Sequence, residues 1–204
     1  IASGTYRTIL VIGSESLSRI VDWTDRGTCI LFGDGAGAVL LQAKEGKSYQ
    51  PVSHSDGRGG SALTGPGVLG RARSIDQDPK ETKTEYITMN GKDVFQFAVR
   101  KVPQVIQEVL KENELSIEDI DWFVLHQANA RIVDAVVRRL RLDIGKFPMN
   151  LQEYGNTSSA SIPILLNELN RKGVLKKGQK LVLAGFGAGL SWGASVLEWD
   201  ITEG

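Results

Sequence analysis

The sequence predicts an α/β protein in which strands and helices alternate along the chain and pack as layers. Short apolar runs recur along the 204 residues, and amphipathic helical patterns separate them in the second half. A weak internal repeat is the third observation: TILVIG at residues 8–13 resembles KLVLAG at residues 180–185, and residues 37–42 resemble residues 193–198. Alternating strands and helices are typical of layered α/β architectures.

Three strands are expected in the first quarter of the chain. Residues 8–12 form a continuous apolar run that ends at a glycine, which is typical of a strand covered on both faces. Residues 29–32 and 38–41 are expected to be the second and third strands, and the glycine-rich residues 33–37 join them. Residues 57–83 are rich in glycine, serine, proline and charge, so we expect a long surface connection there.

The second half is expected to hold three helices and three strands. The first helix begins at Asn90, a short strand follows at residues 122–125, and the second helix comes directly after it. A third helix starts near Ser158, and residues 180–184 and 193–199 are expected to be strands. The apolar positions expected to face the core are Val94, Ala98, Val102, Val105, Val109, Leu110, Ile132, Val133, Val136, Val137, Leu140, Leu165, Leu166 and Leu169.

The composition excludes several classes of function. Lys and Arg together number 24, as do Asp and Glu, so no net field draws the chain to nucleic acid. No apolar run is long enough to span a bilayer, and we expect neither nucleic acid nor a membrane as a partner. One cysteine and two histidines are too few for a zinc site of the usual kind, and the single cysteine favours a reducing compartment. The first residue is Ile1, so we expect a processing site, a boundary or a truncation there.

Three loops at strand ends or helix starts are candidates for chemistry, at residues 126–129, 154–159 and 185–189. His126 and Asn156 can act as two neutral donors aimed at one oxygen, which would stabilise an enolate or an oxyanion. The last loop is rich in glycine and can bring backbone N–H groups close to a ligand. The alternative is that His126 is a structural residue and that Asn156 caps a helix.

Other motifs indicate less. The glycines of residues 33–37 do not have dinucleotide-binding spacing and lead into a strand pattern rather than a helix. Cys29 lies in an apolar run, so we expect an inert core cysteine, and we expect His54 to be structural. Arg131, Asp134, Arg138 and Arg141 share a helix face, with Arg139 beside them. This face is either solvated or a docking patch for an acidic partner.

Four motifs carry a specific resemblance: DRGTCILFGDGAGAVLL, LHQANARI, GNTSSASIP and GFGAGLSWGASVLEW. In this order they resemble β-ketoacyl-acyl carrier protein synthase III. The resemblance implies the thiolase-like layered α/β/α/β/α fold, with the first half truncated at its N-terminus. Residues 1–50 would be the end of the N-terminal half, whose front part is missing, and residues 51–204 the C-terminal half.

The resemblance implies an acyltransferase of type II fatty-acid synthesis. Such an enzyme condenses an acyl-CoA primer with malonyl-acyl carrier protein through decarboxylation, needs no cofactor, and works as a homodimer in the bacterial cytoplasm or the plastid stroma. His126 and Asn156 would then stabilise the enolate, and Gly187, Ala188 and Gly189 would form the oxyanion loop. Much of the family's dimer interface lies in the first half, so dimerisation is not expected of this chain alone.

The same resemblance assigns binding residues. Positions matching coenzyme A and pantetheine contacts are Arg26, Gly27, Gly91, Phe95, Ala128, Asn129 and Ile132, and those implied for carrier-protein docking are Arg131, Arg138 and Arg139. The family's nucleophilic cysteine would lie upstream of Ile1 and Cys29 does not match it, so the isolated chain is not expected to condense. Two alternatives stay open: a non-catalytic module that binds acyl carrier protein or coenzyme A, and a chalcone-synthase-like ketosynthase that uses coenzyme A esters directly.

Overall fold

The computed structural model describes residues 1, 3–46, 48–66 and 86–201. Its strands and helices are β1 (Thr8–Ser16), β2 (Asp34–Gln42), β3 (Val52–Ser55), β4 (Leu63–Thr64), β5 (Thr88–Met89), α1 (Gly91–Glu112), β6 (Trp122–Leu125), α2 (Ala130–Leu140), α3 (Leu151–Tyr154), α4 (Ser161–Arg171), β7 (Lys180–Gly187) and β8 (Ser191–Glu198). Short 3₁₀ helices cover Leu17–Arg19, Gly57–Ala62, Ile117–Asp119, Ile144–Lys146 and Ser158–Ala160.

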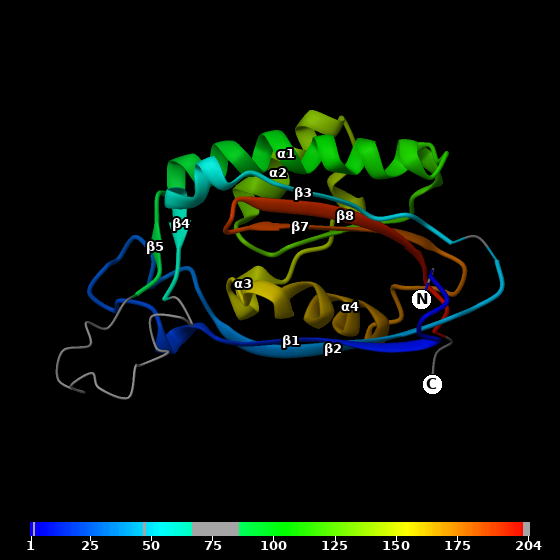
Figure 1. The fold of residues 1–204 in the computed structure, drawn as a ribbon, viewed down its shortest axis with the longest axis horizontal. Helices are drawn as coiled ribbons and strands as arrows, with labels where there is room; N and C mark the ends of the chain where they lie inside the picture. The colour runs from blue at the N-terminus through cyan, green and yellow to red at the C-terminus, as the bar shows by residue number, and fades with distance from the viewer. Residues whose placement is uncertain (2, 47, 67–85, 202–204) are drawn as a thin grey trace.

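These elements stack as four layers in the part of the chain that the structure describes (Figure 1). Helices α1 and α2 form the outer layer and cover one face of a four-stranded sheet in the order β3-β8-β7-β6. Helices α3 and α4 fill the space between this sheet and the two-stranded sheet β1-β2. The layered α/β fold class is therefore confirmed, and four of the five layers implied by the resemblance are present.

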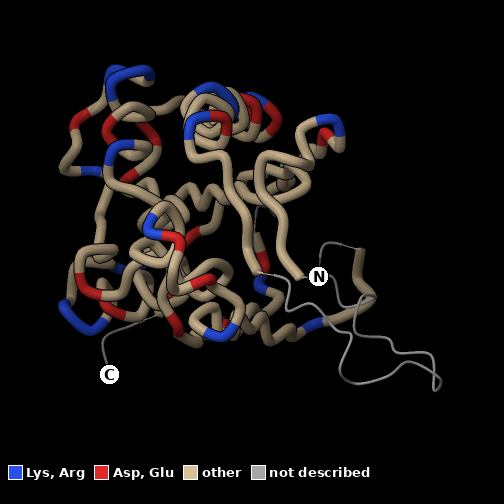
Figure 2. The backbone as a smooth tube through the Cα atoms, turned by 90° about the vertical axis from the view of Figure 1, so that its left-hand side faces the viewer, with Lys and Arg blue, Asp and Glu red and all other residues tan. Residues whose placement is uncertain are grey.

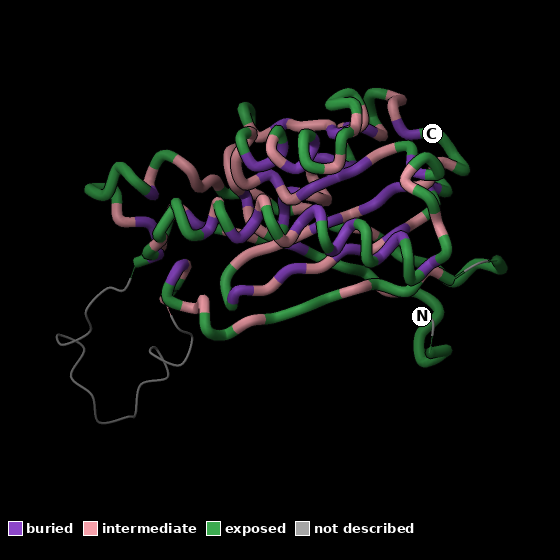
Figure 3. The backbone as a smooth tube through the Cα atoms, turned by 90° about the horizontal axis from the view of Figure 1, so that it is seen from above, coloured by how far each residue is buried: buried purple, intermediate pink, exposed green. Residues whose placement is uncertain are grey.

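The four-stranded sheet supports the rest of the molecule because helices cover both of its faces. Strand β6 pairs with β7 in parallel, and β7 and β3 both pair with β8 antiparallel. Phe123, Val124 and Leu181 are fully buried, as expected of a strand pair between two helical layers. In Figure 3 the buried stretches run through the middle of the molecule, and many loops are exposed.

The helices expected in the second half are confirmed. The Asn90 side chain caps α1 by accepting a hydrogen bond from the backbone N–H of Asp93 at 3.3 Å, and α1 continues through the buried Pro103. Near Ser158 the chain first makes a 3₁₀ turn, and α4 begins only at Ser161. Every apolar position expected to face the core is buried, except Leu140, which is half-buried.

Two expectations about the first quarter are wrong. Residues 29–31 form turns rather than a strand, and Phe32 makes only an isolated bridge, to Asn156. Cys29 is accordingly half-buried in a turn, beside a small cluster that includes Leu17 and Ile87. The sheet β1-β2 is covered on one face only, since Leu10, Ile12 and Leu40 are about 60% exposed (58, 63 and 64%).

The expected surface connection at residues 57–83 is only partly described. Residues 57–66 hold a 3₁₀ helix and β4, which pairs antiparallel with β5. Residues 67–83 lie outside the described residues.

The glycines expected to form a loop before the third strand belong to that strand or directly precede it. Gly33, Gly35 and Gly37 alternate, so they share one face, and this face lies against the segment that leads into α4. A Cβ atom on Gly33 would lie 2.2 Å from the Tyr154 carbonyl oxygen, and one on Gly37 would lie 2.7 Å from Pro163 Cβ. At Gly33 the chain thus packs backbone against backbone, and at Gly35 and Gly37 side chains of the facing segment occupy the space that a Cβ atom would need.

We expect Gly33→Ala to lower the free energy of unfolding by about 1–3 kcal/mol, because the added methyl group meets backbone that has no room to move. Urea denaturation followed by circular dichroism measures the change. Gly57→Ala is the matched control, since nothing lies within 4 Å of its added Cβ, and it should change stability by less than about 0.5 kcal/mol. Equal stability of the two variants would contradict the close packing.

Candidate active site

His126 lies at the end of β6, where the four-stranded sheet meets a pocket. Its backbone N–H donates to the Ala184 carbonyl at 2.8 Å, so the parallel pairing of β6 with β7 continues as far as this residue. Carboxyl ends of parallel strands are where side chains converge in α/β folds. Asn129 then starts α2 by accepting from the backbone N–H of Arg131 at 2.9 Å.

The surroundings of the His126 ring keep it neutral. Its Nδ1 atom lies 2.7 Å from the Ser161 hydroxyl oxygen, and Phe186 presents its ring at 67° with a centroid distance of 5.3 Å. Burial lowers the pKa of His126 from 6.5 to about 4, against a smaller opposing effect of the Glu15 carboxylate. At neutral pH the ring therefore carries one proton and no charge.

Asn156 lines the same pocket and is held there by its own backbone. Its N–H donates to the Leu31 carbonyl at 2.9 Å, and its carbonyl accepts from the Gly33 N–H at 2.9 Å. Its side-chain oxygen accepts from the Ser158 backbone N–H at 2.9 Å. A backbone N–H can only donate, so this contact fixes the amide orientation and leaves the Nδ2 group to donate. In the described residues Nδ2 has no protein partner.

Asn156 is not the N-cap of a helix, because Thr157 precedes the 3₁₀ helix and Ala160 precedes α4. Its side-chain oxygen instead closes a local turn, and its amide nitrogen remains available to a ligand. The chain turns sharply on either side of it, with φ of +66° at Gly155 and +46° at Ser158. Positive φ at a non-glycine residue is uncommon, and such conformations cluster at functional sites.

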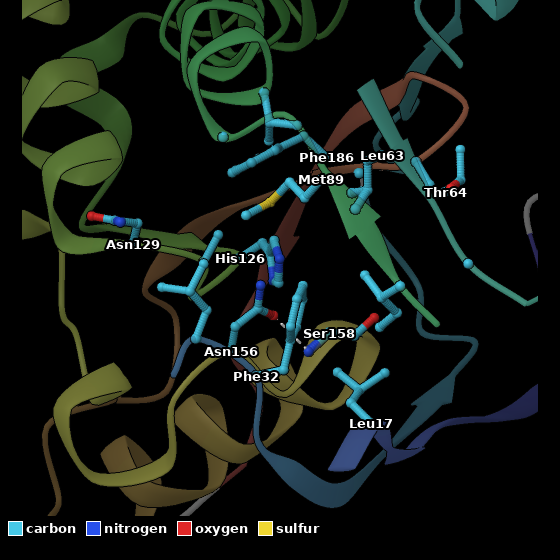
Figure 4. Close-up of a pocket in the computed structure, with 18 of the residues that line it drawn as sticks. Leu17, Phe32, Leu63, Thr64, Met89, His126, Asn129, Asn156, Ser158 and Phe186 are labelled. Carbon is cyan, nitrogen blue, oxygen red and sulfur yellow. Dashed lines mark hydrogen bonds between the residues drawn. The ribbon is translucent and has the colours of Figure 1, made fainter. Parts of the chain in front are cut away.

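A cavity of about 410 Å³ brings the predicted site residues together (Figure 4). The residues of its wall that the resemblance assigned are His126, Asn156, Gly27, Gly91, Phe95, Ala128, Asn129, Ile132, Gly187 and Ala188. Figure 4 shows His126 and Asn156 next to each other, with Phe32 beside them. Arg26 and Gly189 do not line this cavity. Both are exposed, and each is next in sequence to a residue that does line it, Gly27 and Ala188 respectively.

Most of the remaining wall is apolar, and apart from Ser158 and Phe186, which belong to the candidate loops, it was not predicted. It consists of Leu17, Ile20, Leu31, Phe32, Leu63, Ile87, Met89, Val94 and Phe186, with a few polar or small residues at Thr64, Gly65, Pro66 and Ser158. Ligand pockets are commonly apolar with a few convergent polar groups, and this one fits that description. The sequence signal was present at residues 31–32, but the apolar run was interpreted as a strand.

The expected glycine loop is the hairpin between β7 and β8. Gly187 still belongs to β7 and pairs with Ser191, whereas Ala188 and Gly189 form the exposed turn. Gly189 has φ of +133°, a conformation that side chains rarely adopt. The loop therefore approaches the cavity through the backbone of Gly187 and Ala188.

A second cavity, of about 440 Å³, lies on the Ser161 side of the His126 ring. Six serines contribute to its wall: Ser53, Ser55, Ser158, Ser159, Ser161 and Ser191. His54 also lines it, bonds Glu108 at 2.6 Å and lies against Trp192 with a centroid distance of 5.3 Å. His126 thus borders both cavities. Cys29 borders neither.

The loop after β6 is fixed by buried amides. Gln127 is 1% exposed, donates to the Leu125 carbonyl at 2.7 Å, and accepts from the Asn150 backbone N–H at 3.2 Å. Asn150 in turn donates to Glu168 of α4 at 2.8 Å. Such a network resists small displacements of the ring that precedes it.

The arginines considered for docking are exposed on α2. Arg131, Arg138 and Arg139 all face solvent, and Lys and Arg are otherwise interspersed with Asp and Glu (Figure 2). No cluster that could hold a metal ion occurs among the described residues. In the same part of the chain, no helix has the length and apolar character needed to cross a membrane.

Comparison with known proteins extends these observations. Residues 1–57 match the family model described as 3-oxoacyl-[acyl-carrier-protein] synthase III, and residues 110–199 match the model of its C-terminal part. The chain is 46% identical over 200 residues to the β-ketoacyl-[acyl-carrier-protein] synthase III of Clostridium acetobutylicum, and 50% identical over 203 residues to that of Microcystis aeruginosa. Both alignments cover 98% of this chain but only 61% of the relative.

Solved structures of synthase III enzymes also resemble this chain. The synthase III of Thermus thermophilus aligns with a TM-score of 0.86 at 41% identity, over 97% of this chain and 61% of that one. The Pseudomonas aeruginosa enzyme aligns with a TM-score of 0.86 at 36% identity, over 98% of this chain and 60% of that one. The chain thus spans about three-fifths of the length of the relatives it matches.

The depressed pKa of His126 predicts a loss of stability in mild acid. Below pH 6.5 the unfolded chain binds a proton that the folded chain does not, down to about pH 4. The free energy of unfolding should therefore fall by at most about 1.4 kcal/mol per pH unit across that window, and this loss should level off below it.

Urea titrations at closely spaced pH values measure this slope. Subtracting the profile of His126→Gln from that of the original chain isolates the contribution of His126, because carboxylates titrate in both. His54→Gln leaves His126 in place and should therefore retain the pH dependence that His126 contributes. Identical pH profiles for the original chain and His126→Gln would show that the ring is not held neutral by burial.

Proposed function

The chain belongs to the 3-oxoacyl-[acyl-carrier-protein] synthase III family, and on that premise we propose that it carries the decarboxylation site of a condensing enzyme. The whole enzyme would join an acyl-CoA primer to malonyl-acyl carrier protein. The observation that carries the proposal is the pairing of a neutral His126 with the unpartnered amide nitrogen of Asn156 at one cavity.

The chemistry needs such a pair. When the malonyl thioester loses carbon dioxide, the bond to its carboxylate breaks and the electron pair moves into an enolate. Two neutral donors that meet the thioester oxygen stabilise this developing charge without first binding a carboxylate strongly. A charged histidine would favour the ground-state carboxylate as well, so the neutral ring favours the decarboxylation step.

The apolar wall contributes to the same step. Leu31, Phe32 and Phe186 give the cavity apolar wall surface, and electrostatic stabilisation is stronger in apolar surroundings than in water. The cavity also extends to Gly27 and Gly91, which suits an extended pantetheine arm entering from the surface. Gly187 and Ala188 would supply backbone donors from the opposite wall.

Condensation itself needs an acylated thiol, from which the enolate displaces the acyl group. We assign no such role to Cys29, because it borders neither cavity and packs against the small cluster of Leu17 and Ile87. The residues of this chain therefore account for decarboxylation, and the acyl-carrying thiol of the whole enzyme would come from residues outside this chain.

The partners and compartment follow from the same family. Arg131 is exposed in the first turn of α2 beside the loop of His126, and Arg138 and Arg139 are exposed in its last turn, which suits an acidic carrier protein. Bacterial relatives are joined by a chloroplastic one from Cuphea wrightii, 49% identical over 210 residues. We accordingly assign the protein to the bacterial cytoplasm or plastid stroma, and the whole enzyme to a homodimer.

The chain should release carbon dioxide slowly from malonyl-CoA without forming a condensation product. His126→Ala and Asn156→Ala should each lower that rate by about 10²–10³-fold, because each removes one donor to the enolate oxygen. Conversion of malonyl-CoA to acetyl-CoA, followed by mass spectrometry, gives the rate. Asn167→Ala is the control, since Asn167 is exposed on α4.

Unchanged rates in the two donor variants would overturn the proposed roles. Tight binding of malonyl-CoA with no release of carbon dioxide would instead favour a non-catalytic binding module.

Arg131→Glu should weaken binding of malonyl-acyl carrier protein by about tenfold at low salt and leave binding of malonyl-CoA unchanged, because the arginine lies outside the cavity. Surface plasmon resonance at two salt concentrations measures both. Arg171→Glu makes the same charge change at the far end of α4 and should affect neither ligand. If carrier-protein binding survives Arg131→Glu, a ketosynthase acting directly on coenzyme A esters becomes the better explanation.

A further inference from the structure

Ser161 is the first residue of α4 and contacts the side of the His126 ring that faces away from the main cavity. Its hydroxyl oxygen is 2.7 Å from His126 Nδ1 and 3.3 Å from the backbone nitrogen of Gln127, and the residue is only 2% exposed. Nothing in the sequence distinguishes it, because it is one of three serines between residues 158 and 161.

The hydrogen-bonding capacity of this hydroxyl decides which ring nitrogen carries the proton. A serine hydroxyl has one proton to donate and can accept two hydrogen bonds. The Gln127 N–H can only donate, so one acceptor position is taken. The remaining contact, with Nδ1, requires a proton either on the ring nitrogen or on the hydroxyl.

If Nδ1 carried the proton, Ser161 would accept twice and its own proton would need another acceptor. Among the described residues the Ser161 hydroxyl has no contact with a backbone carbonyl or a carboxylate. A buried hydroxyl proton without an acceptor is unfavourable. If the hydroxyl donates to Nδ1 instead, every one of these polar atoms is satisfied.

We propose that Ser161 is a positioning residue that fixes His126 as its Nε2–H tautomer, so that the ring presents a proton to the main cavity. The tautomer assignment follows from the hydrogen bonds alone. Its use in decarboxylation rests on the proposed function, in which the neutral ring donates to the enolate oxygen. The hydrogen bond made by one ring nitrogen sets the proton position on the other. Ser161 acts through His126 and is not itself a cavity-wall residue beside Asn156.

Two features of the fold support this role. Gln127 is buried, Leu125 and Asn150 hold its side chain, and its backbone N–H donates to the Ser161 oxygen. The ring is also uncharged at neutral pH, so the two nitrogens differ and the choice between them is a real one. The neighbouring Ser159 hydroxyl is engaged elsewhere, because it donates to Glu15 of β1 at 2.5 Å.

Nitrogen-15 magnetic resonance tests the proposal on the chain as it is. The sequence has only two histidines, so long-range proton–nitrogen correlation gives two ring patterns, and His54→Gln assigns them. At neutral pH we expect a pyridine-type Nδ1 and a pyrrole-type Nε2 for His126, with the Nε2–H form in about tenfold excess or more.

Ser161→Ala should shift both nitrogens of His126 toward values averaged between the tautomers, and Ser161→Thr, which keeps the hydroxyl, should restore the original pattern. Ser159→Ala is the matched control and should leave the pattern unchanged. A pyrrole-type Nδ1 in the original chain would overturn the proposal, even if Ser161→Ala failed to fold. Unaltered nitrogen shifts in a folded Ser161→Ala would overturn it as well.

This readout is separate from turnover. If malonyl-CoA is neither bound nor decarboxylated while the Nε2–H pattern is present and depends on Ser161, the proposed function fails and the tautomer assignment stands. If decarboxylation depends on His126 while its tautomer is Nδ1–H, the proposed function stands and the tautomer assignment fails.

Discussion

The contact between residues 31–33, directly before β2, and the segment that leads into α4 determines where Asn156 lies. Gly33 donates to the Asn156 carbonyl, and the Leu31 carbonyl accepts from the Asn156 N–H, so the residue is clamped from both sides. This approach is possible because Gly33, Gly35 and Gly37 present no side chains to that segment. A donor amide is useful only when its position is fixed before the ligand arrives, and in this fold the position is fixed by main-chain atoms.

His126 reaches the same place from a different sheet. It extends the pairing of β6 with β7, and Ser161 contacts its ring from the first turn of α4. The site is therefore assembled where the four-stranded sheet, the inner helices and the small sheet meet (Figure 1). Each layer contributes something distinct: the ring, the groups that orient it, and the backbone that holds the amide.

Much of this could be predicted from the sequence, and the failures have physical causes. The helix beginning at Gly91 follows from periodicity, because its buried residues face one core cluster. The strand before His126 follows from its continuous apolar run, because Phe123 and Val124 face different clusters on its two sides. The run at residues 29–32 misled because apolar residues that line a ligand cavity resemble those that line a core: Leu31 and Phe32 face the cavity. The contact of Ser161 with the His126 ring could not be predicted. A 3₁₀ helix, with three residues per turn, precedes α4, and this changes which of the three serine hydroxyls lies against the ring.

The glycine-lined contact also bears on how the protein fails under stress. Sheet β1-β2 has one exposed face and anchors Asn156, whereas His126 belongs to the well-covered larger sheet. Opening of such a weakly covered unit costs less than opening of the core. Among the described residues, a partial opening of the small sheet would thus move Asn156 away from His126 while the larger sheet and its helices persist, so the geometry of the site is less stable than the fold as a whole.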